Sequence, residues 1–366
     1  MLKASNTHNA RRAIRNASAR RGTAPQVVRK TRGRKYSYDA LKVLIEVWTL
    51  IGEPCGKYYA AIMEDSLTRL RRHGEQKRVA GRISEKVWDE LLAMSPATID
   101  RYLAPTRAAR YPQAKSATRA GNTLRSQIKV RQAGDEMEQC PGFLEVDLVA
   151  HCGHTLKGEF LWTLTETDVF LGWTVNLAIK NRASRHVIAA MDHVRAVLPY
   201  PITGVDVDNG GKFINYDLIA WCEERDIAMT RARPYKHNDN AHVEQKNGAV
   251  VRREAFRYRY ETAEEMGLLG ELWHLVNLRK NYLLPTVKAI GWRQTKAGRK
   301  AHVYDKPATP YQRLTDSGTL DEVAIAALNA IAEPLNPAEI TRRVNSIQQQ
   351  LIASAKARTQ AGRTAA

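Results

Sequence analysis

The sequence lacks several features that would assign it to a specialised class of protein. Its four cysteines are scattered and form no CxxC pair, which argues against a disulfide framework and against a structural zinc site. No hydrophobic run approaches the roughly 18 residues that a membrane span needs, and the basic N-terminus has no hydrophobic segment of signal-peptide length. We therefore expect a soluble protein of the cytoplasm with no membrane contact.

Acidic residues are absent from the first 35 positions, which hold eleven lysines and arginines. Such a segment cannot bury enough hydrophobic surface to fold, so residues 1–35 are predicted to form a disordered basic arm. The whole chain of 366 residues carries a net charge of +19. Nucleic acid is the commonest partner of so basic a protein. Solubility alone is the alternative explanation, but the clustering of the charges favours a polyanionic partner.

Residues 36–104 show the periodicity of helices. Hydrophobic residues recur between Leu41 and Ile51 at steps of three and four, which produces one hydrophobic face. Gly52-Glu53-Pro54 is expected to end this helix, and a further helix is expected to start at Ser84.

The end of this region has the signature of a short capped helix. Ser95 suits an N-cap and Pro96 a first helical residue. Thr98, Asp100 and Arg101 are expected to point outward. A helix, a tight turn and a short capped helix are typical of a helix-turn-helix motif, so Ser95, Thr98 and Arg101 are candidate DNA contacts. A purely structural helix bundle is the alternative.

Residues 105–140 are rich in lysine and arginine and contain Pro105, Pro112 and Gly121. We expect a basic linker that lies along a DNA backbone. Residues 285–320 predict a small basic β-domain with a hairpin that turns near Gly298. Residues 321–366 predict a helix from Pro337 to about residue 353 and a frayed tail.

Residues 141–284 change to a pattern of strands and helices. The expected strands are 143–149, 158–165, 170–179, 202–207 and 227–230, and the expected helices are 187–198, 213–225, 240–253 and 262–282. This order predicts a mixed sheet covered by helices on both faces, which is the ribonuclease-H-like topology. The fold class is therefore a multidomain protein with an α/β ribonuclease-H-like core, N-terminal all-α helix-turn-helix domains and a small C-terminal β-domain.

Three acidic residues of this core are expected to meet. Asp147 lies within the first strand, Asp208 ends the fourth strand before Asn209-Gly210-Gly211, and Glu244 lies in the following helix. Two-metal phosphoryl transfer needs carboxylates that hold hard cations roughly 3.5–4 Å apart. Carboxylates fixed on strands and a helix suit that demand.

Other residues compete for these positions. Asp206 is the main alternative to Asp208, and Glu145 and Asp168 are weaker alternatives to Asp147. The pair His151 and His154 suggests a zinc site, but its spacing fits no common tetrahedral set.

Two motifs carry a family resemblance. Asp208-Asn209-Gly210-Gly211-Lys212-Phe213 resembles the motif DNGxxF, and residues 240–247 resemble NGxxExxN, with Ala241 in place of the glycine. Thirty-five residues separate Asp208 from Glu244, the spacing of the D,D-35-E group. Over residues 140–285 the chain therefore resembles bacterial insertion-sequence transposases of the retroviral-integrase superfamily, with a DDE catalytic core.

The resemblance implies an activity and its partners. Asp147, Asp208 and Glu244 would be the catalytic residues and would hold two Mg²⁺ or Mn²⁺ ions per active site. The protein would cleave the 3′ ends of an insertion element with water and transfer the strands to target DNA. It would act as a homo-oligomer on double-stranded DNA in the bacterial cytoplasm, associated with the nucleoid, and an ATPase helper is a candidate further partner.

Polar and aromatic residues around the acids are candidate contacts for DNA phosphates and a splayed base. They are Arg233, Tyr235, Lys236, His237, Asn240, Lys246, Arg252 and Arg253. Two other functions remain open: a sequence-specific DNA-binding regulator with an inactive core, and a structure-selective nuclease on the same fold.

Overall fold

The protein is described from a computed structural model. The structure describes residues 35–75, 83–110, 129–131, 140–207, 216–232, 250–294, 298 and 300–364. The chain divides into Met1–Ser37 and a compact unit, Tyr38–Ala366, and the second unit contains all the elements discussed below. No described helix is long and hydrophobic enough to span a membrane.

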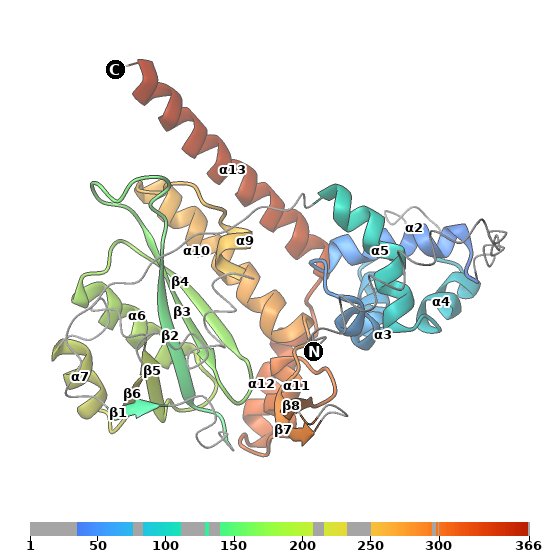
Figure 1. Ribbon diagram of the computed structural model, residues 1–366, viewed down its shortest axis with the longest axis horizontal. Coiled ribbons are helices and arrows are strands. Elements are labelled where there is room, and N and C mark those ends of the chain that lie inside the picture. The colour runs from blue at the N-terminus through green and yellow to red at the C-terminus, as the bar shows by residue number, and fades with distance from the viewer. Residues whose placement is uncertain are drawn as a thin grey trace, which may run out of the picture. The chain divides into compact units, whose positions relative to one another are not determined.

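The elements of this unit are labelled in Figure 1. The helices are α2 (Tyr38–Leu50), α3 (Gly56–Arg72), α4 (Glu85–Leu92), α5 (Pro96–Arg110), α6 (Ser184–Val197), α7 (Tyr216–Glu223), α9 (Arg252–Glu254), α10 (Ala263–Leu278), the π-helix η3 (Arg279–Leu283), α11 (Pro310–Asp316), α12 (Glu322–Ala332) and α13 (Pro337–Thr364). The strands are β1 (Lys129–Arg131), β2 (Phe143–Ala150), β3 (Trp162–Asp168), β4 (Thr174–Ile179), β5 (Gly204–Val207), β6 (Ala228–Ala232), β7 (Ala289–Gln294) and β8 (Lys300–Tyr304).

The larger sheet has the strand order β1-β6-β5-β2-β3-β4. β3 pairs antiparallel with β2 and β4, whereas β5 pairs parallel with β2 and β6. This arrangement confirms the predicted mixed sheet. β1 was not predicted: it lies within the expected linker at 105–140 and pairs parallel with β6.

Each face of the sheet has its own hydrophobic core, and helices cover both faces (Figure 1). On one face, Val146 and Val207 pack with residues of α6 and α7 such as Met191 and Trp221. On the other face, Val149 packs with residues of α10 and α13. Covering both faces is the expected solution for a sheet whose central strands are hydrophobic on both sides.

Two asparagines fix α10 and η3 against the edge strand β4. The side chain of Asn277 accepts from the backbone N–H of Asn176 at 3.0 Å and donates to its carbonyl at 3.1 Å. Asn281, one turn later, makes the same pair of bonds with Thr174 at 2.8 Å each. These bonds satisfy β4 backbone groups that lack a neighbouring strand.

The N-terminal helices begin and end close to where the sequence predicts. α2 ends at Leu50, and Ser84 caps α4 by accepting from the Val87 N–H at 3.3 Å. α5 continues past Pro105 to Arg110, although the sequence predicts that this proline interrupts the helix. A long-range ion pair holds the last turn of α5. Arg110 pairs with Glu53, which lies in the turn between α2 and α3.

The side chain of Asp100 is 44% exposed, and its carboxylate also has partners within the protein. Its Oδ1 accepts from the backbone N–H of Gly56 at 2.8 Å and from Arg107 at 2.6 Å. The first N–H groups of a helix have no partner within that helix, and Asp100 supplies one for α3. A Cβ at Gly56 would lie 2.3 Å from the Pro96 carbonyl oxygen, so α3 and α5 approach closely at this glycine.

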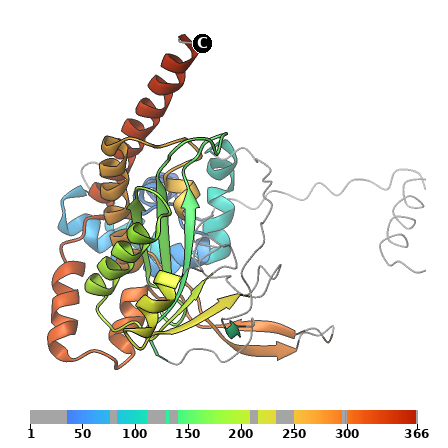
Figure 2. The same cartoon turned by 90° about the vertical axis from the view of Figure 1, so that its left-hand side faces the viewer.

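The C-terminal region contains more helix than the sequence predicts. The hairpin of β7 and β8 (Figure 2) turns near Gly298, which has a φ of +73°, as expected. The chain then enters α11 and α12, which were not predicted, and α13 continues to Thr364 instead of ending near residue 353.

α13 connects the N-terminal helices with the core. Its Thr341 donates to the carbonyl of Leu50, at the end of α2, at 2.5 Å. Farther along, Gln348 donates to the carbonyl of Glu254 in α9 at 2.8 Å, and Leu351 lies in the core cluster with α10. The predicted part of this helix therefore contacts both the N-terminal helices and the core.

Candidate active site

Asp147 lies in the middle of β2, half-buried, and its Oδ1 accepts from the N–H of Leu148 at 2.7 Å. Its register partner in β3 is Thr165. On the other side of β2, Val146 lies opposite Val207, the last residue of β5. Asp147 is therefore one residue beyond the point where β5 ends.

The two faces of β2 define the surroundings of Asp147. Side chains alternate along a strand, so Asp147 shares a face with Val149 and not with Val146. Val149 belongs to the same core cluster as Val250 and Val251. Val250 and Val251 therefore pack on the face of the sheet that carries Asp147.

Two other acids of this face are enclosed in the sheet. Glu145 lies opposite Asp206 in the pairing of β2 with β5, and their side chains are 3% and 0% exposed. Asp206 also accepts a hydrogen bond from the hydroxyl of Thr230 in β6. Asp206, the alternative to Asp208, thus has a structural partner in the neighbouring strand.

Asp168, an alternative to Asp147, bonds to the backbone. Its two carboxylate oxygens accept from the N–H groups of Gly142 at 2.7 Å and Leu171 at 2.6 Å. Burial raises the pKa of Asp168 to about 6, against the opposing effect of these hydrogen bonds. Burial also raises the pKa of the neighbouring Glu166 well above its ordinary value. Both acids lie inside the protein, and Asp168 joins the start of β2 to the end of β3.

His151 follows β2 and is buried. Its Nε2 lies 2.7 Å from the hydroxyl of Thr163, which also accepts from Trp273 at 3.0 Å. Burial lowers the pKa of His151 to about 3, and the nearby charge of Arg252 contributes. This partner set fits a neutral core histidine. Among the described residues, no group of three histidines, cysteines or acids could hold a metal ion.

Most of the other predicted site residues lie outside the described residues. They are Asp208, Arg233, Tyr235, Lys236, His237, Asn240, Glu244 and Lys246.

Three predicted contacts lie at the start of α5. Ser95 and Arg101 are exposed and Thr98 is half-buried. Ser95 caps the helix by accepting from the Thr98 N–H at 3.4 Å, and the two hydroxyls lie 3.0 Å apart. Ile99 and Leu103 are fully buried, so the hydrophobic face of α5 is the predicted one.

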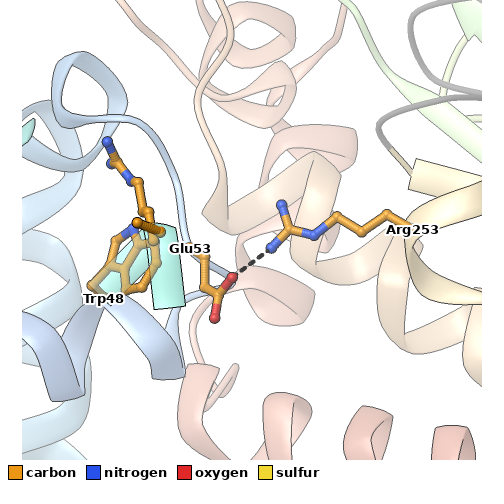
Figure 3. A pocket seen from close by; sticks show the side chains of 5 residues that line it. Trp48, Glu53 and Arg253 are labelled. Atoms are coloured by element: carbon orange, nitrogen blue, oxygen red, sulfur yellow. Dashed lines mark hydrogen bonds and ion pairs between the residues drawn. The ribbon is translucent and has the colours of Figure 1, made fainter. Parts of the chain in front are cut away.

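Arg252 and Arg253 both extend from α9 and are exposed. The Nη2 of Arg253 lies 3.0 Å from the Glu53 carboxylate (Figure 3). The pocket around this pair is lined by Trp48, Glu53, Arg107, Ala108 and Arg253. Sequence reasoning did not find this pocket, because nothing in the spacing of residues 200 positions apart indicates that they meet.

Comparisons with known proteins show what the chain is similar to. A family model described as an integrase core domain matches residues 138–237. The catalytic core domains of HTLV-2 integrase, in complex with magnesium, and of BIV integrase are each 16% identical to the chain, with TM-scores of 0.30 and 0.31. These matches cover 40% and 48% of this chain and 89% and 94% of the integrase chains.

A relative matches a longer part of the chain. The uncharacterized protein y4rM of Sinorhizobium fredii (strain NBRC 101917 / NGR234) is 34% identical over 280 residues. The match covers 76% of this chain and 78% of the relative. The chain belongs to the DDE-type integrase and transposase superfamily, a class of polynucleotidyl transferases.

Proposed function

We propose that this protein is a DNA transposase that cleaves the 3′ ends of an insertion element and transfers them to target DNA. Asp147, Asp208 and Glu244 are the proposed catalytic carboxylates. The observation that carries the proposal is the parallel register of β2 with β5, in which Val146 lies opposite Val207.

That register supports a meeting of Asp147 with Asp208. Asp208 is bonded to Val207, and consecutive Cα atoms lie about 3.8 Å apart. Asp147 thus follows Val146, and Asp208 follows Val207, the two residues that lie opposite each other in the sheet. An acid inside a strand and an acid after the end of the neighbouring strand are well placed to share a ligand.

The third acid is supported by packing. Glu244 precedes Val250 by six residues, and Val250 packs in the cluster of Val149 on the Asp147 face. A helix that carries Glu244 toward Val250 would run over this face, because six residues span about 9 Å in a helix.

The acids would hold the metal, and other residues would position the DNA. Carboxylates are the ligands that Mg²⁺ and Mn²⁺ prefer, and two such ions would activate the attacking oxygen and stabilise the leaving oxygen. The half-buried position of Asp147 within β2 fits a metal ligand, because the strand limits its movement. Ser95, Thr98 and Arg101 would contact element ends, and α4 and α5 would act as a helix-turn-helix.

A strand-transfer assay tests the proposal. Labelled duplexes that carry the element's ends are incubated with plasmid DNA and Mg²⁺, and joined products are counted. Asp147→Asn should reduce joining at least about a hundredfold, the scale on which a lost electrostatic contribution acts in catalysis. Binding of the same duplexes should be retained, because the carboxylate does not attract DNA.

Matched variants separate the competing functions. Asp192→Asn removes an acid of α6 that bonds to Trp221 and should leave joining unchanged. Joining by Asp147→Asn at the wild-type rate would reject the assignment. Duplex binding without joining by the wild-type protein would favour the regulator, and cleavage of branched DNA or hybrids without joining would favour the nuclease.

A further inference from the structure

A pocket of about 400 Å³ opens where the α2–α3 turn meets α5 and α9 (Figure 3). Arginines dominate it: Arg107 and Arg253 line it, and Arg110 reaches its edge by pairing with Glu53. We refer to Arg107, Arg110, Arg253 and Glu53 together as the arginine pocket. The guanidinium groups of Arg107 and Arg110 lie 5.4 and 5.8 Å from the ring centre of Trp48. The Trp48 ring lines one side of the pocket.

The arginines of the arginine pocket are more exposed to solvent than Glu53. The side chains of Arg107, Arg110 and Arg253 are 30%, 41% and 38% exposed, whereas that of Glu53 is 10% exposed. A ligand that arrives from solvent therefore meets three cations before it meets the carboxylate. Asp100, whose side chain is 44% exposed, pairs with Arg107 and offsets its charge, so the net positive charge of the pocket comes mainly from Arg110 and Arg253.

Glu53 joins two arginines from different parts of the chain. Its Oε1 accepts from Arg110, at the end of α5, and its Oε2 accepts from Arg253 at 3.0 Å. A phosphodiester presents two unesterified oxygens that arginines bind in the same manner. The carboxylate thus occupies the position that suits a DNA phosphate.

The backbone conformation of Glu53 indicates that its side chain has a function. Glu53 has a φ of +60° and follows Gly52 at +87°. The left-handed region of backbone conformation disfavours residues other than glycine, asparagine and aspartate. Backbone strain of this kind is retained where the side chain has a task, and the task visible here is to hold Arg110 and Arg253.

We propose that the arginine pocket binds a backbone phosphate of DNA, and that Glu53 substitutes for this phosphate until DNA arrives. On binding, the phosphate replaces Glu53 as the partner of Arg110 and Arg253. Because these residues belong to α5 and α9, the phosphate would connect the N-terminal helices to the core. The inference rests on the proposed function, since that function supplies DNA as the ligand.

Duplex binding tests the inference separately from catalysis. The full chain is titrated into a fluorescent 30-base-pair duplex in EDTA, so that no metal-dependent step contributes, and anisotropy gives the Kd. Glu53→Gln should tighten binding about two- to fivefold, the range that a solvent-accessible ion pair is worth. Glu271→Gln is the matched control, because it changes the net charge equally by removing the exposed partner of Arg343. It should tighten binding less.

The salt dependence gives a second readout. Arg253→Gln should weaken binding and reduce the slope of log K against log salt by about 0.9, the contribution of one phosphate contact. Arg343→Gln, which removes an arginine from an exposed pair on α13, should leave the slope closer to that of the wild type.

Glu53→Asn separates competition with DNA from a structural role. Asparagine tolerates a positive φ, and this relief offsets the loss of the two ion pairs of Glu53, so this variant should fold and should bind DNA as tightly as Glu53→Gln. Equal affinities for the Glu53 and Glu271 variants would overturn the proposal, as would an unchanged slope in Arg253→Gln. Failure of both Glu53 variants to fold would also overturn it, because a substitute for DNA must be dispensable. If joining is absent but these binding effects hold, the transposase proposal fails and the phosphate pocket stands.

Discussion

Glu254 of α9 and Arg279 of η3 form a buried ion pair, with 2.7 Å between the carboxylate Oε1 and the guanidinium Nη2. Their side chains are 8% and 4% exposed. Burial raises the pKa of Glu254, but Arg279, together with Lys280 and Arg253, holds it below its ordinary value. Glu254 lies ten residues after Glu244, the third of the proposed catalytic acids.

Removing Arg279 should destabilise the protein strongly. Arg279→Met would leave the buried carboxylate of Glu254 without its partner, which costs about 3–5 kcal/mol. Denaturant unfolding would measure the loss. Replacing both members of the pair, Glu254→Leu with Arg279→Met, should recover much of it, because no buried charge then remains. Arg343→Met breaks an exposed pair with Glu271 and should cost at most about 1 kcal/mol. A similar small cost for Arg279→Met would contradict the prediction.

Replacing Asp206 should affect the stability of the protein, whereas replacing Asp208 should affect strand transfer. Asp206→Ala would remove the hydrogen bond from the half-buried Thr230, and a typical hydrogen bond contributes about 0.5–1.5 kcal/mol. We expect a lower unfolding temperature with strand transfer retained in the folded protein. Asp208→Ala should abolish strand transfer with little change in unfolding temperature. The reverse pattern, measured by calorimetry and by the joining assay, would assign the catalytic role to Asp206.

His151 should make stability fall in acid. Its pKa is about 3 in the folded protein and about 6.5 when unfolded. Between these values the unfolded state binds the additional proton, so the free energy of unfolding decreases as pH falls, by up to about 1.4 kcal/mol per pH unit. His151→Gln should lack this contribution while it keeps a bond to Thr163.

The difference between the unfolding free energies of the wild type and His151→Gln isolates the contribution of His151. The raised pKa of Asp168, about 6, acts in the opposite direction, because it makes the folded protein less stable as pH rises from about 4 to about 6. Asp168 is present in both proteins and cancels in the comparison. Parallel pH profiles of the two unfolding free energies, recorded from pH 4 to 7, would disprove the assignment to His151.

Local patterns in the sequence predicted much of the fold. The hydrophobic spacing of α2 and the β-branched strands β2 to β5 are periodic signals, and the tertiary structure satisfies each of them. β1 was missed because Lys129–Arg131 is short and basic and has no periodic pattern. α13 was predicted to be too short, since its final turns are rich in alanine, arginine and glutamine, which also suit a frayed tail.

Contacts between distant residues could not be predicted in this way. Asp100 of α5 bonds to α3 because the Gly56 N–H, 44 positions away, needs an acceptor. Glu53 meets Arg253 only once α2 and α9 have packed. The sequence predicts Asp147, Asp208 and Glu244 as a set because their motifs are local. Of the three, the structure describes Asp147 alone, in β2 beside the end of β5, and their catalytic role stays a prediction.

The three residues of β1 have a consequence for work with fragments of this protein. Because β1 pairs with β6, the outer backbone groups of β6 are covered by a segment that precedes the integrase core match at residue 138. A truncated protein that begins at residue 140 would leave that strand edge open, and open edges recruit strands from other molecules. Aggregation of such a truncation would therefore reflect a missing edge strand and not an unstable catalytic core.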